Sequence, residues 1–113
     1  MIEVYGIKNC DSVKKALKFF KLHALEYELF DFKTQKITPE QIEMWLEKTD
    51  ITTLFNARST TYRNLKLKEM HLDDTAKVKW LSQENLLIKR PVVIYKEHLL
   101  VGYDEEKYKR IFL

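Results

Sequence analysis

Cys10 is the only cysteine among the 113 residues, and a lone thiol does chemistry only as an accessible thiolate. It follows a short apolar segment, residues 2–5, that reads as a strand, and it precedes a helical pattern. A thiol at this position meets unpaired backbone N–H groups and the positive end of a helix dipole, and both favour the thiolate. Lys8 adds a cation two residues away. The alternative is a buried, inert cysteine, and position alone does not decide between the two.

Arginine is scarce, and its positions are the second chemical signal. The sixteen other basic residues are lysine, and the four arginines are Arg58, Arg63, Arg90 and Arg110. All but Arg110 flank turn-like or poorly periodic segments rather than regular helix faces. A guanidinium group is a planar fork that fits oxyanions and carboxylates. These arginines are therefore either part of an anion or thiolate site or surface residues in modest salt bridges.

The elements that position the thiol form a predicted βαβ unit. The helix after Cys10 has one apolar stripe at spacings of three and four, made by Val13, Ala16, Leu17 and Phe20. Its opposite face, which we expect to be solvated, carries Lys14, Lys15, Lys18 and Lys21. Asp11 or Ser12 is the expected N-cap. The aromatic-rich segment 26–32 has strand length, so the order strand, helix, strand predicts two parallel strands.

The middle of the chain is predicted to be helical. Residues 38–41, Thr-Pro-Glu-Gln, combine an N-cap, a first-turn proline and a capping-box glutamine, and the helix that follows is expected to bury Ile42, Trp45 and Leu46. A second helix is expected over about 74–84, with Ala76 and Trp80 inward and Asn85 as its stop. The segment 54–63 between these helices has no readable period.

The end of the chain predicts a hairpin and a last helix. Pro91 opens the apolar run 92–95, Lys96-Glu97 forms a turn, and 98–101 is the returning strand. Asp104 is the expected N-cap of the final helix, whose charges match the helix dipole. Its apolar face consists of Tyr108, Ile111 and Phe112. We expect one domain over residues 1–113.

Composition excludes several classes of function. No apolar run approaches the roughly 20 residues of a membrane helix, and no leader precedes the first strand, so we expect a cytoplasmic protein without membrane contact. A net charge of +3 is too small and dispersed to indicate direct nucleic-acid binding. The three histidines lack ligand spacing, so no metal site is expected, and two glycines cannot form a phosphate loop. A monomer is the expected state.

Four segments in order resemble the bacterial arsenate reductase family that couples to glutaredoxin (ArsC), and most closely its YffB-like and Spx-like branches. The resemblance covers essentially the whole chain and implies an α/β, thioredoxin-like fold: β-α-β and then β-β-α in a four-stranded mixed sheet. It further implies a helical insertion at about residues 38–85, between strands two and three, and a cis Pro91 facing the thiol. The matching segments are 4–11, 56–63, 88–93 and 101–104.

The resemblance also assigns roles to individual residues. It makes Cys10 the nucleophile and implies that Arg58 and Arg90 bind an oxyanion and hold the thiolate. Arginine suits this role because its charge does not titrate away. Positions expected to bind a substrate or an incoming thiol are Lys8, Asn9, Arg63 and Pro91.

Two departures from the family pattern leave two functions open. Tyr103 stands where arsenate reductases have a third arginine, which weakens an arsenate assignment and favours the glutathione-dependent thiol reductase implied by the YffB-like branch. The Spx-like branch instead implies a regulator that binds RNA polymerase. Its members typically switch through a Cys-x-x-Cys disulfide, but Val13 occupies the second position here. Without an internal resolving cysteine, the thiol needs glutathione or glutaredoxin as co-substrate, and no bound cofactor is expected.

Overall fold

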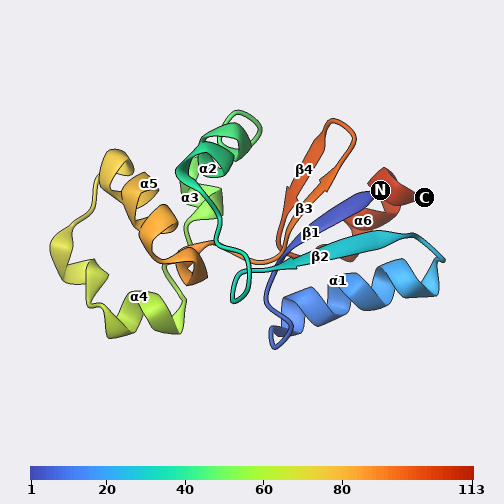
Figure 1. Ribbon diagram of the computed structural model, residues 1–113, viewed down its shortest axis with the longest axis horizontal. Coiled ribbons are helices and arrows are strands. Elements are labelled where there is room, and N and C mark those ends of the chain that lie inside the picture. Colours follow the sequence, from blue (N-terminus) through green and yellow to red (C-terminus); the bar gives the residue numbers. More distant parts are fainter. The chain divides into compact units, whose positions relative to one another are not determined.

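The computed structural model describes residues 1–113 and divides the chain into two compact units (Figure 1). The first unit consists of Met1–Gln35 together with Arg90–Leu113, and the second consists of Lys36–Lys89. The first unit is therefore built from both ends of the sequence, with the second inserted between them. The single domain expected over residues 1–113 stays a prediction.

A four-stranded mixed sheet forms the centre of the first unit, in the order β2-β1-β3-β4. Its strands are β1 (Ile2–Gly6), β2 (Tyr27–Asp31), β3 (Val92–Tyr95) and β4 (His98–Val101). The first two are parallel, as predicted, and both β1·β3 and β3·β4 are antiparallel. The central strand β1 pairs at Val4 with Leu29 on one side and with Val93 on the other.

Two helices complete the first unit, α1 (Asp11–Leu22) and α6 (Glu105–Phe112). The core between helices and sheet is largely aromatic, with Phe20 fully buried and its ring stacked 5.7 Å from that of Tyr108. Leu17, expected in the buried stripe, packs only at the margin of this core, and Phe19 is buried in its stead. The order β-α-β then β-β-α around a mixed sheet is the thioredoxin-like fold, as predicted.

All the regular elements of the second unit are helices, which agrees with the predicted helical insertion between β2 and β3. Its α-helices are α2 (Pro39–Trp45), α3 (Ile51–Leu54), α4 (Thr60–Asn64) and α5 (Asp74–Gln83), and its 3₁₀ helices are η1 (Leu67–Met70) and η2 (Asn85–Leu87). The capping box is present as predicted: Gln41 N donates to Thr38 Oγ1 at 3.2 Å, and Thr38 N donates to Gln41 Oε1 at 3.0 Å.

Two long-range contacts organise the second unit. Asn85 does more than stop α5, because its Oδ1 accepts from Ile37 N at 2.8 Å and its Nδ2 donates to Leu81 O at 2.8 Å. Phe55 forms an isolated antiparallel bridge with Ile88, within the segment whose period could not be read. Ala76 and Trp80, which were expected to face inward, are both partly buried, and the fully buried side chain of α5 is Leu81.

Candidate thiol site

Cys10 itself is the N-cap of α1, so the prediction that Asp11 or Ser12 caps this helix is wrong. Its backbone is extended, with φ −132° and ψ 126°, and its carbonyl accepts the first helical hydrogen bond from Lys14 N at 2.9 Å. The Cys10 side chain makes no capping hydrogen bond. Cys10 is partly exposed as a residue, and it stands at the end of α1 where the N–H groups of the first turn lack intrahelical partners. Lys8 and Asn9, both exposed, precede it in the same loop.

The segment Arg90-Pro91 lies against the start of this loop. An added Cβ at Gly6 would sit 3.8 Å from Arg90 Cβ and 3.9 Å from Pro91 Cα. The Arg90–Pro91 peptide bond is cis, as expected from the resemblance. Arg90 is partly buried and Pro91 is buried. The structure thus brings both residues to the end of β1, four positions before Cys10.

Two hydrogen bonds hold the backbone of Pro91 to the C-terminal part of the chain. Gly102 N donates to Pro91 O at 2.8 Å, and the buried Tyr108 Oη donates to Gly102 O at 2.8 Å. Gly102 has φ 82°, in the left-handed region that favours glycine. The sequence pattern predicted Tyr108 only as part of an apolar face, and this role of its hydroxyl was not expected. The nearest signal in the sequence is a glycine directly after a strand.

Tyr103 occupies the position of the third arginine as a partly buried phenol. Its ring lies 4.9 Å from that of Tyr108 in an edge-to-face arrangement. Burial, with smaller contributions from Glu105 and Asp104, raises the pKa of Tyr103 above its ordinary value. The side chain is therefore neutral at physiological pH and cannot replace the fixed positive charge of a guanidinium group.

Arg58 and Arg63 lie together in the second unit. The Nη1 atom of Arg63 donates to Arg58 O at 3.4 Å, and Arg58 N donates to Asn56 Oδ1 at 3.0 Å. Both arginines are exposed. Arg58 and Lys89 both line an open hollow of about 710 Å³. Two cations and several polar groups make this hollow suitable for an anion, and the predicted roles of Arg58 and Arg63 stay predictions.

Other kinds of site find little support in the side chains. No group of three or more His, Cys, Asp or Glu residues is arranged to hold a metal ion. None of the helices combines the length and apolar character that a membrane crossing requires.

The sheet order and the thiol at the N-cap of α1 define a thioredoxin-like protein with one cysteine. The chain belongs to the ArsC family, whose model matches residues 5–111. This is the family indicated by the four sequence segments, and the match spans nearly the whole chain.

Three known proteins illustrate this relationship. A protein of Haemophilus influenzae, named only as uncharacterized, is 38% identical over 113 residues, covering 99% of both chains. The global transcriptional regulator Spx of Lactiplantibacillus plantarum is 23% identical over 97% of this chain and 85% of its own length. A solved structure named YFFB protein superposes with a TM-score of 0.92 at 29% identity and covers both chains completely. The relatives thus include a named regulator, and the family name is that of an enzyme.

Proposed function

We propose that this protein is a cytoplasmic thiol oxidoreductase in which Cys10 is the nucleophile and glutathione or glutaredoxin is the co-substrate. The proposal combines ArsC family membership with the arrangement around the thiol. The observation that carries it is the convergence of two segments far apart in sequence. The loop that ends in the partly exposed Cys10 begins at Gly6, where the backbone of Pro91 lies alongside.

The reaction begins with attack of the Cys10 thiolate on the glutathione sulfur of a mixed disulfide. A new Cys10–glutathione disulfide forms, the original S–S bond breaks, and the substrate leaves as a thiolate that takes up a proton from water. A second glutathione thiolate then attacks the sulfur of the bound glutathione. Oxidised glutathione leaves and the Cys10 thiolate returns, so one disulfide is consumed and one is produced.

The absence of a second thiol determines how this cycle ends. Val13, at the position of a resolving cysteine, is fully buried and offers no sulfur. The mixed disulfide is therefore resolved only by an external thiol, which is why the proposal includes glutathione or glutaredoxin. A cytoplasmic location supplies this reductant, since thiols are kept reduced there.

The arginines add fixed positive charge in this proposal. Arg90 stabilises the thiolate or a bound anion from its position beside the Cys10 loop. The same role is proposed for Arg58 and Arg63, but it is supported only by the resemblance to the family. Lys8 and Asn9 bind the incoming thiol together with Pro91. Arsenate is not the proposed substrate, because Tyr103 replaces one of three arginines of the family pattern by a neutral phenol.

A glutathione-coupled assay with a small mixed disulfide tests the proposal. Turnover by the wild-type protein and its loss in Cys10→Ser is the expected result. Ser82→Ala is a suitable control, because it changes a hydroxyl in the second unit that bonds only to the nearby Lys79 O. If the wild-type protein reduces the disulfide no faster than glutathione does alone, the proposed enzymatic function is contradicted.

The second candidate is a transcriptional regulator that binds RNA polymerase without a disulfide switch. The Spx relative, aligned over 97% of this chain, is the observation that favours it. Purified RNA polymerase distinguishes the two: a stoichiometric complex that forms equally well with Cys10→Ser, with no disulfide turnover, would establish the regulator and exclude the enzyme.

A further inference from the structure

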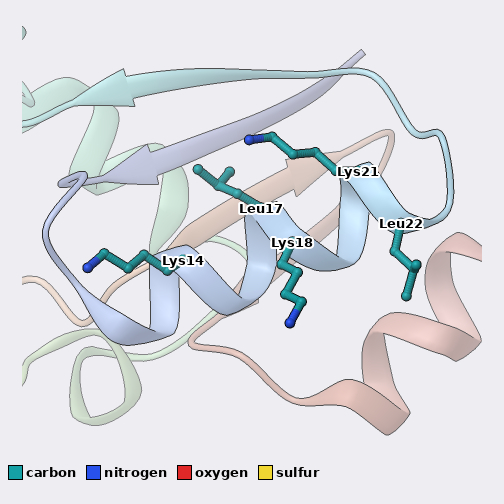
Figure 2. Close-up of a pocket in the computed structure, with 5 residues that line it drawn as sticks. All are labelled: Lys14, Leu17, Lys18, Lys21 and Leu22. Atoms are coloured by element: carbon teal, nitrogen blue, oxygen red, sulfur yellow. The ribbon is translucent and has the colours of Figure 1, made fainter.

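The outer face of α1 carries a hollow bordered by positive charge and apolar surface. It has a volume of about 490 Å³ and is lined by Lys14, Leu17, Lys18, Lys21 and Leu22. Figure 2 shows these side chains projecting from α1, with the three amino groups spread along the helix. No carboxylate lines the hollow. We call this surface the lysine face.

Leu22 makes the lysine face unusual for a solvated helix surface. It is 76% exposed, the largest exposed fraction of any non-terminal large hydrophobic residue in the chain. Lys18 and Leu22 also line a second hollow, of about 330 Å³, toward Tyr103. Exposed apolar side chains inside a rim of like charges are typical of a surface that docks a partner of opposite charge.

A second helix of the same chain has the opposite character. Met44 on α2 is 64% exposed, second only to Leu22 among the non-terminal large hydrophobic residues. Three exposed glutamates, Glu40, Glu43 and Glu47, lie within four residues of it. Glu40 lies one turn before Met44 on α2, Glu43 is its neighbour in sequence, and Glu47 lies in the turn that follows the helix. The exposed Lys48 is the one cation in this stretch, so the surface around Met44 is mainly negative. We call this surface the glutamate face.

We propose that the lysine face of one copy of this chain binds the glutamate face of a second copy. The two faces match in charge, and each offers one apolar side chain for burial. Leu22 is 76% exposed and Met44 is 64% exposed, so both side chains are available for a contact. A contact made by one helix face and one short helix is small compared with a stable protein interface, so the association is weak. Because it depends on exposed charges, it is also sensitive to salt. The expected monomer then exchanges with self-associated forms at high protein concentration.

Charge reversal tests the pairing with the full chain. Sedimentation equilibrium of the wild type is expected to show self-association that weakens as salt rises from about 0.05 M to about 0.5 M. Lys18→Glu/Lys21→Glu and Glu43→Lys/Glu47→Lys should each raise the apparent dissociation constant about tenfold, as expected for losing two ion pairs. An equimolar mixture of these two variants should associate again, because the reversed faces complement each other.

Two controls separate docking from general charge effects. Lys33→Glu/Lys107→Glu changes the net charge by the same amount at exposed residues outside both faces and should leave association unchanged. Leu22→Ser keeps every charge and should weaken association. Unaltered unfolding temperatures would show that all variants are folded. A wild type that stays monomeric, a mixture that fails to associate, or association that Leu22→Ser leaves intact would each overturn the proposal.

Discussion

Val13 lies against Gly6 so closely that no side chain fits between them: a Cβ added at Gly6 would be 2.7 Å from Val13 Cγ2. This contact joins the end of β1 to the first turn of α1, on either side of Cys10. The position of the thiol therefore depends on a glycine that shows no sign of chemistry in the sequence.

Gly6→Ala is expected to destabilise the protein by about 1–3 kcal/mol, the usual cost of overpacking a buried position. The displaced loop should also change the alkylation rate of Cys10. Urea unfolding and iodoacetamide kinetics measure the two effects. Val13→Ala makes room for the new methyl group, so the double variant should be more stable than the sum of the single changes predicts. If the changes in unfolding free energy of the two single variants simply add in the double variant, the contact with Val13 is not what excludes a side chain at Gly6.

Tyr108→Phe removes the hydroxyl that donates to Gly102 O and keeps the buried ring. Leaving a buried carbonyl without this donor should cost about 1–3 kcal/mol of unfolding free energy. Hydrogen exchange at Gly102 N–H, which donates to Pro91 O, should become faster. Unchanged protection of this amide would show that the tyrosine does not hold the Pro91 segment. Tyr62→Phe is a matched control in the second unit.

Stability should fall at alkaline pH through Tyr5. Burial, reinforced by Glu3 and Glu28, raises the pKa of Tyr5 from 10.0 to about 12. The native state therefore keeps this phenol neutral after the unfolded chain has ionised it. Its contribution to stability is complete below pH 10.0 and is lost as pH rises from there to about 12. In Tyr5→Phe this part of the alkaline loss should disappear, as measured by urea unfolding across the range. Parallel pH profiles of variant and wild type would contradict the assignment.

Arg90→Lys keeps a positive charge near the Cys10 loop and loses the planar fork. Glutathione-coupled turnover should fall about tenfold or more, with little change in unfolding free energy, and Arg90→Ala should lower it further. Arg110→Lys is the matched control, since Arg110 is exposed near the end of α6. Full activity in Arg90→Ala would remove Arg90 from the proposed site.

Asn85→Ala should destabilise the second unit. Its amide links Ile37 N to Leu81 O, so truncation leaves a donor and an acceptor without this partner, at a cost of about 1–3 kcal/mol. Asn85→Asp keeps an acceptor for Ile37 N but places a carboxylate oxygen beside Leu81 O, so it should not restore stability. Urea unfolding compares the three proteins. An aspartate variant as stable as the wild type would show that the Leu81 contact contributes nothing.

The sequence predicted those elements whose causes are local. The capping box at Thr38, the proline at Pro39 and the dipole-matched charges of α6 all act within one helical turn, so short-range chemistry suffices to read them. The hairpin of β3 and β4 is likewise local, because its two strands and the turn between them are adjacent in sequence. Family resemblance added the sheet, the insertion and the cis bond at Pro91.

What the sequence did not show depends on contacts between distant residues. Phe55 pairs with Ile88 and Asn85 bonds to Ile37, and neither partner can be found from the spacing of nearby residues. The N-cap was misplaced because cysteine is not a preferred capping residue, whereas Asp11 and Ser12 are. The roles of Arg58 and Arg63 stay predictions for the same reason, since a role at a thiol depends on tertiary placement.

The discontinuous first unit has a consequence for synthesis on the ribosome. Strand β1 is made first, but β3, one of its two neighbours in the sheet, begins only at Val92. The helical unit emerges as one continuous segment before the sheet can close, and non-local strand pairing is slow to form. Throughout this interval the nascent chain carries Cys10 on a half-built sheet. Cys10 is therefore synthesised well before the Arg90-Pro91 segment that lies beside the start of its loop, so its surroundings are complete only after the helical unit has emerged.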